Sequence, residues 1–526
     1  MNKILLNILV PVLLSVAVFG QSDIAQLKKS FLTPQDEARP WVYWYIMDGY
    51  LNKPGIRSNL EAMKKAGING VIFCEIGGFV EKGKVDMMST EWRENFKFAV
   101  QETERLGMEF TLGTGPGWTG SGGSWVSVEE SMLNLVSSAT NISGNADVML
   151  PRPKPEEPFF GMESLNEPMR IARDKFYKDV RVLAYPKTDA NKPFSYLKER
   201  TLYIRSPFSS DKRSIPSIPM PSPGDIINQE TGINPDKMID LTSIMQPDGR
   251  LVWNAPAGEW TVYRFGITTS GANTRPAPVA GYGFECSKLD TIALMHHFEN
   301  FHQKLIDDLG KSITGKNRTR GWNMLHIDSW EMGPQNWSYD FPSEFKKRRG
   351  YDMIPYLPAY SGQIVGDREK TERFLWDMRM TAQELMLENH AIYVKKFAHK
   401  NGMGLSIEPY DMNPASDLAL GAIADVPMCE FWTKNRFITA FSCIEATSVA
   451  HTNNKKIVAA EAMTFGHTPG WIDNPGNMKG QVDWGFASGI NRMNFHVSVL
   501  QPYLDLFPGM SLGSCGSFYN PTQTWL

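Results

Sequence analysis

Four glutamates follow short, mostly apolar runs, and this placement indicates chemistry. Glu408, Glu430 and Glu461 each come directly after a run of four residues, and Glu331 ends a longer run that starts at Met324. Short apolar runs between turn signals are typical of buried parallel strands. A buried carboxylate is costly unless it is paired, so a structural role for all four acids is hard to defend. We interpret them as candidates for an active site at the carboxyl ends of the strands of an α/β barrel.

Two carboxylates facing one another could cleave a glycosidic bond. One must be protonated to donate to the leaving oxygen, and the other must be ionised to activate water or attack the sugar. Burial raises the pKa of one such group, while a polar setting keeps the pKa of the other low. Flat apolar rings that could stack on sugar faces are frequent in the same part of the chain, at Trp330, Trp337, Trp432, Trp471 and Trp484.

Four acids are more than this chemistry requires. A hard cation such as Ca²⁺ takes about six to eight oxygen ligands and would use the surplus, with Asp328 and Asp425 close in sequence. The surplus acids could equally bind sugar hydroxyls. His326 and His496 lie in strand-like runs, where each could face the site or be a core residue.

Two other classes of function stay open. In one, acids on successive barrel strands hold Mg²⁺ for proton abstraction next to a carboxylate, although no Lys lies at a strand end to act as base. In the other, an inactive barrel binds carbohydrate without turnover. No His-Glu-x-x-His, Gly-x-Ser-x-Gly or Cys-x-x-Cys motif is present.

The elements that position these acids alternate in a β-α-β order. Helical stripes of apolar residues separate the strand-like runs, which indicates a parallel sheet. The strand candidates number eight, as a (β/α)₈ TIM-like barrel requires. They are 41–47, 71–75, 109–113, 324–329, 404–408, 426–430, 457–461 and 492–499.

The third of these strands runs into a glycine-rich loop, 115–125. The loop lacks the Gly-Lys-Ser/Thr of a phosphate-binding loop. Its glycines would instead let the backbone approach a ligand closely, with Trp118 or Trp125 as a wall. Prolines and short strand-like pieces follow, which predict a β-rich subdomain inserted after strand three.

The N-terminus predicts export. Lys3 precedes an apolar run from Ile4 to Phe19, as in a cleaved secretory signal. The chain has 526 residues and a net charge of −3, and no second apolar run of spanning length, so we expect neither a nucleic-acid partner nor membrane insertion. No feature indicates an oligomeric state. We expect a signal peptide at 1–21, barrel parts at 22–140 and 288–505, the β-rich subdomain at 141–287, and the truncated start of a C-terminal region at 506–526.

Several ordered motifs carry a resemblance to a known family. From about Arg39 to the C-terminus, the chain resembles glycoside hydrolase family 106, the α-L-rhamnosidases. The motifs are Pro40–Tyr45, Gly115–Trp125, His326–Glu331, Asp425–Trp432 and Ala459–Thr464.

The resemblance implies a secreted or periplasmic barrel enzyme that removes terminal α-L-rhamnose from plant polysaccharide, with inversion and with calcium in the site. By motif, Glu331 matches the general acid and Glu461 the general base, and Glu430 matches a residue of the sugar and calcium site. Glu408 matches an acid whose role is not assigned. We expect Trp118, Asp328, Glu408, Trp432 and His496 to contact the substrate, and Glu430 to bind the metal.

Overall fold

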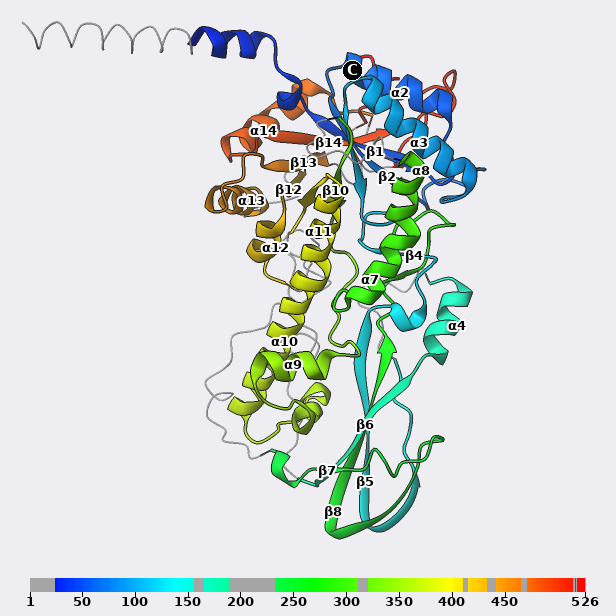
Figure 1. Cartoon of the computed structure of the whole chain (residues 1–526), viewed down its shortest axis with the longest axis vertical. Coiled ribbons are helices and arrows are strands. Elements are labelled where there is room, and N and C mark those ends of the chain that lie inside the picture. The colour runs from blue at the N-terminus through cyan, green and yellow to red at the C-terminus, as the bar shows by residue number, and fades with distance from the viewer. Residues whose placement is uncertain are drawn as a thin grey trace, which may run out of the picture.

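Eight parallel strands close into a barrel in the computed structural model. The structure describes residues 24–155, 165–188, 232–310, 320–409, 415–432, 441–464, 471–513, 516 and 518–525. The strand order around the ring is β1-β14-β13-β12-β11-β10-β3-β2. Figure 1 shows the barrel at the top of the view and a long sheet extending below it. The predicted (β/α)₈ barrel is confirmed.

The barrel strands coincide closely with the strand-like runs of the sequence. Three of them, β1, β3 and β14, have the predicted bounds, and the others differ by a few residues at their ends. The strands are β1 (Trp41–Met47), β2 (Gly70–Ile76), β3 (Glu109–Gly113), β10 (Gly321–Ile327), β11 (Gly404–Ile407), β12 (Val426–Trp432), β13 (Ala459–Thr464) and β14 (Arg492–Val499).

Helices between the strands begin at polar caps that the sequence supplies. The Asn52 side chain accepts a hydrogen bond from the first turn of α2, and Ser89 and Asp367 do the same for α3 and α10. Helices around the barrel include α2 (Lys53–Lys65), α3 (Thr90–Arg105), α7 (Thr291–Phe298), α8 (Lys304–Leu309), α10 (Arg368–Met386), α11 (Ile392–Lys400), α12 (Asp417–Ile423), α13 (Phe441–Thr452) and α14 (Pro475–Ala487).

Alternation along β1 divides its side chains between two apolar layers. Tyr43 and Tyr45 belong to the cluster inside the barrel, with Ile72 of β2 and Val497 of β14. Trp44 belongs to the larger cluster between strands and helices. This period of two turns Tyr43 and Tyr45 toward the barrel axis.

Between β3 and β10 the chain forms an antiparallel sheet of four strands in the order β5-β8-β6-β7. These strands are β5 (Leu133–Met149), β6 (Lys178–Pro186), β7 (Ile239–Asp240) and β8 (Arg250–Thr269). A separate two-stranded pair joins β4 (Gly122–Gly123) to β9 (Phe284–Glu285), near the barrel. This pair ties the glycine-rich loop to the segment that follows β8.

The chain after β14 packs back on that strand. The Tyr519 amide donates to the Val497 carbonyl at 2.9 Å, and the Val499 amide donates to Asn520 Oδ1 at 2.9 Å. No helix within the described ranges is long and apolar enough to cross a bilayer. The predicted signal peptide lies outside the described residues.

Candidate active site

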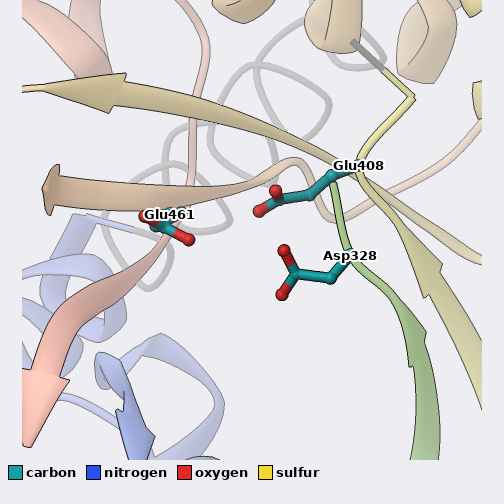
Figure 2. Close-up of side chains that lie close together, drawn as sticks. All are labelled: Asp328, Glu408 and Glu461. Atoms are coloured by element: carbon teal, nitrogen blue, oxygen red, sulfur yellow. The ribbon is translucent and has the colours of Figure 1, made fainter. Parts of the chain in front are cut away.

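Three carboxylates meet at the carboxyl end of the barrel. Asp328 directly follows β10, Glu408 directly follows β11, and Glu461 lies in β13. One oxygen of each lies within 4.8 Å of an oxygen of the others, and Figure 2 shows the three side chains converging. We call these residues the acid cluster. Parallel strands bring their carboxyl ends to one rim, so acids distant in sequence become neighbours.

A hydrogen-bonded network supports the acid cluster from β1, β10 and β11. The Tyr43 hydroxyl donates to Glu408 Oε1 at 3.1 Å and lies 3.2 Å from His326 Nε2. His326 Nε2 lies 3.0 Å from Asp328 Oδ2, and its Nδ1 lies 2.8 Å from Ser406 Oγ. Glu408 Oε2 is buried and has no hydrogen-bond partner among the described residues. That oxygen is therefore available to a ligand.

Burial and mutual repulsion perturb the charges of the acid cluster. Burial raises the pKa of Glu408 and of Glu461 well above the usual value, and the neighbouring carboxylates raise both further. Burial also raises the pKa of Asp328, but hydrogen bonds from His326 and Ser329 outweigh it and leave that pKa below its usual value.

This donor set fits a hard divalent cation. Three carboxylates supply oxygen ligands, which Ca²⁺ prefers, and the buried Glu408 Oε2 has no hydrogen-bond partner in the part of the chain that the structure describes. Asp328, Glu408 and Glu461 are thus the residues that could hold an ion. Glu430, the predicted metal ligand, pairs in register with Glu461 on the adjacent strand but is not a member of the acid cluster. The Trp432 indole donates to Glu430 Oε1.

Glu331 is not a member of the acid cluster and lies in the loop after β10, close enough to Asp328 for that carboxylate to raise its pKa. Its Oε2 lies 3.3 Å from Arg275 Nη2, and its side chain is 25% exposed. Burial raises the pKa of Glu331, while Arg275 and a hydrogen bond from Trp118 hold it back. In the closed ring, β10, which precedes Glu331, and β13, which carries Glu461, are three strands apart.

Two predicted substrate contacts lie near the acids. The Trp118 ring stacks on Tyr45, with centroids 6.0 Å apart, and is partly exposed. The His496 ring packs edge-on against Tyr43 and Tyr45, and its Nδ1 has no partner among the described residues. Burial lowers the pKa of His496 to about 4, so the ring is neutral at ordinary pH. Trp125, the alternative wall, packs instead on His297.

The sequence analysis missed Tyr43 and Arg275 in this region and left the role of His326 open. Tyr43 could have been found, because alternation in β1 turns it inward beside the acids. His326 was left open as a core residue, but it contacts Asp328, Tyr43 and Ser406. Arg275 carried no signal, because its approach to Glu331 depends on a loop fold distant in sequence.

Comparisons with known proteins show the family to which the chain belongs. The family model described as alpha-L-rhamnosidase, Glyco_hydro_106, matches residues 32–526, and the chain belongs to this family. A Formosa agariphila protein, named provisionally as a beta-glucuronidase, is 34% identical over 531 residues, which cover 100% of this chain and 42% of that protein. The solved structure of a rhamnosidase from Novosphingobium sp. PP1Y superposes with a TM-score of 0.77 at 26% identity, covering 93% of this chain and 58% of that one. The chain thus spans about half the length of these relatives.

Proposed function

We propose that this protein is an inverting glycoside hydrolase that removes terminal α-L-rhamnose from a plant polysaccharide or glycoside. The observation that carries the proposal is the convergence of Asp328, Glu408 and Glu461, with Glu331 nearby, in a chain of family 106. Family membership supports the rhamnose specificity. The acids support a two-carboxylate mechanism.

In this mechanism Glu331 is the general acid. Its raised pKa favours the protonated form, and its proton passes to the glycosidic oxygen as the bond from that oxygen to the anomeric carbon breaks. Arg275 and Trp118 would hold the carboxyl in place. Water attacks the anomeric carbon from the opposite face, and the water proton passes to Glu461, the general base. Burial raises the pKa of Glu461, and a cation held by the acid cluster would favour the ionised form that a base requires.

The separation of the two carboxyl groups distinguishes an inverting from a retaining mechanism. An inverting pair stands about 6.5–9.5 Å apart to leave room for water, whereas a retaining pair stands about 5–5.5 Å apart. Adjacent strands are roughly 4.8 Å apart, and β10 and β13 are three strands apart in the ring. Strand spacing does not by itself set the separation of the carboxyl groups, because Asp328 and Glu461 also come from strands three apart and their oxygens lie within 4.8 Å.

We propose Ca²⁺ as the cofactor, held by Asp328, Glu408 and Glu461. Bound there, Ca²⁺ would neutralise negative charge on the three carboxylates and could accept hydroxyl oxygens of the sugar as ligands. The supporting observations are the oxygen-only donor set and the buried Glu408 Oε2, for which the described residues provide no hydrogen-bond partner. Glu430, Trp432 and His496 are proposed as further contacts of the sugar and metal site.

The proposal extends to location and domain organisation. A signal peptide at 1–21 would direct the protein to the periplasm or outside the cell. The sheet of β5 to β8 would be a subdomain carried by the barrel. The provisional name of the Formosa agariphila relative makes a β-glucuronide the competing substrate.

A panel of nitrophenyl glycosides, with Ca²⁺ or with chelator, tests the function. We expect turnover of the α-L-rhamnoside, loss of turnover in chelator, and recovery with Ca²⁺. Cleavage of the β-glucuronide instead would overturn the substrate, and full activity in excess chelator would remove the metal. Proton NMR of the first product tests stereochemistry, because an inverting enzyme releases β-rhamnose before mutarotation. α-Rhamnose as first product would make Glu461 a nucleophile or its pairing with Glu331 wrong.

A further inference from the structure

The contact between Arg275 and Glu331 depends on residues that hold the two loops carrying them. Arg275 lies between β8 and β9, and Glu331 follows β10, so two separate loops must be held in register. Both side chains are about a quarter exposed, 26% and 25%, and their 3.3 Å contact is not enclosed tightly enough to hold itself. The distance between the two side chains therefore depends on the contacts that hold the backbones of the two loops.

Residues of the glycine-rich loop clamp the backbone of Arg275. The amides of Trp118 and Thr119 donate to its carbonyl at 3.2 and 3.3 Å, and its own amide donates to Thr119 Oγ1 at 3.0 Å. Gly117 has φ +73°, and a Cβ there would lie 2.7 Å from the Arg275 carbonyl group. The loop thus approaches Arg275 as closely as a backbone without a side chain allows.

The Thr119 hydroxyl connects this clamp to a buried ion pair. While accepting from the Arg275 amide, it donates to Glu285 Oε1 at 3.0 Å. Glu285 Oε2 accepts from Lys288 Nζ at 2.7 Å, and both side chains of this pair are fully buried. Lys288 Nζ also donates to the carbonyls of Ser121 and Cys286, at 2.8 Å each.

The backbone of Lys288 also holds the loop that carries Glu331. The Lys288 amide donates at 2.9 Å to Oε1 of Gln335, which lies four residues beyond Glu331. Gln335 Nε2 in turn donates to Ser287 and to the Trp337 carbonyl. The loops that carry Arg275 and Glu331 are therefore both hydrogen-bonded to the segment that contains Glu285 and Lys288.

Burying the Glu285–Lys288 ion pair has a high desolvation cost, which only complete hydrogen bonding of both groups offsets. Lys288 has three acceptors, and Glu285 has two donors, so each charge is satisfied. Buried ionic groups of this kind add little to stability compared with apolar residues of similar size, whereas they can fix one arrangement among alternatives.

We propose that Thr119, Glu285 and Lys288 are positioning residues for the proposed general acid: acting through Arg275, they hold the Glu331 carboxyl where it can protonate the leaving oxygen. The inference rests on the proposed role of Glu331. Its readout is leaving-group dependence, since a misplaced acid hurts substrates with poor leaving groups and spares activated ones.

The test compares Thr119→Val, Thr119→Ser and Thr381→Val. Thr119→Val should lower kcat about ten- to a hundredfold on an unactivated rhamnoside, as expected of a misplaced group, and less than about threefold on the nitrophenyl rhamnoside. Thr119→Ser keeps the hydroxyl and should restore the wild-type ratio of the two rates. Thr381 is a matched control, because it is fully buried and its hydroxyl also accepts from an arginine, Arg349, and donates to a carbonyl. Equal losses on both substrates for folded Thr119→Val would overturn the proposal.

Arg275→Lys completes a double-mutant cycle that does not depend on one variant. Because Thr119 acts through Arg275, Thr119→Val should change the leaving-group ratio little when Arg275→Lys is already present. Fully additive effects would overturn the proposal. A crystal structure of Thr119→Val should have the Arg275 guanidinium displaced from Glu331, and an unmoved guanidinium would also overturn it. Displacement in an enzyme whose wild type fails to cleave rhamnosides would instead overturn the proposed function.

Discussion

Glu285 and the acid cluster are both buried, but their surroundings are opposite. Glu285 has Lys288 and Thr119 as partners, so its charge is matched by the chain itself. Asp328, Glu408 and Glu461 have one another, and in the part of the chain that the structure describes none of them pairs with a lysine or arginine. The first arrangement is complete without a ligand. The second accumulates like charge, which a cation or a proton must offset.

The largest effect should come from removing the base of the acid cluster. Glu461→Gln leaves the attacking water without a proton acceptor, so we expect kcat to fall by about 10⁴-fold even on nitrophenyl rhamnoside. Glu109→Gln is the control, since that acid begins β3 at the opposite end of the barrel and bonds Asn323. Steady-state kinetics on both variants checks this. Substantial activity of Glu461→Gln would mean that the acid cluster only binds.

Replacing Glu331 should affect activity differently on different substrates, unlike replacing the base of the acid cluster. Glu331→Gln removes the proton donor, and we expect a loss of about 10²- to 10⁴-fold on natural linkages. On the activated nitrophenyl rhamnoside the loss should stay below about tenfold, because that leaving group needs little protonation. Measuring kcat on both substrates decides the role. Equal losses would show that Glu331 is not the acid.

Stability should change in opposite directions in the two regions. Lys288→Met leaves Glu285 buried without its cation, which should cost about 3–5 kcal/mol of unfolding free energy. Glu408→Gln, measured in chelator, should raise stability, because the wild-type carboxyl must either carry a like charge in the acid cluster or take up a proton on folding, and an amide does neither. Urea unfolding of both variants gives the two signs. A destabilised Glu408→Gln would mean that its carboxylate is already compensated in the metal-free protein.

Glu75 is an intermediate case and should give the smallest effect. It is buried, with neutral donors at Gly49 and Trp92, and burial raises its pKa from 4.5 to about 8. Between these values the folded state holds a proton that the unfolded state has released, so rising pH destabilises the wild type. Glu75→Gln should therefore gain on the wild type from pH 4.5 to 8. The hydrogen bond that Glu75→Gln loses lowers its stability by the same amount at every pH. Urea unfolding across this pH window measures the difference in unfolding free energy between variant and wild type, and a difference that does not change with pH would refute the raised pKa of Glu75.

Short sequence patterns were sufficient to predict the barrel. Apolar runs located all the barrel strands, because a strand buried on both faces needs apolar residues regardless of its neighbours. The acids at the strand ends followed from the same pattern. Sequence could not choose between Glu430 and Glu408 as partners of Glu461, since that depends on strand register and on side-chain direction at the rim. Nor could it predict the approach of Arg275 to Glu331, which arises from two loops meeting over Lys288.

The pairing of β1 with β14 has a consequence for how the chain folds. Trp41 pairs with Asn494, so the ring joins residues near the two ends of the described chain. A nascent chain has β1, β2 and β3 long before β14. The edge of β3 is covered once β10 is made, but β1 stays an open edge until β14 is made. The sheet of β5 and β8 needs only residues 133–269 and can form earlier. Closure by β14 is thus a late step of high contact order, and a chain halted before it exposes strand edges that can pair with other molecules.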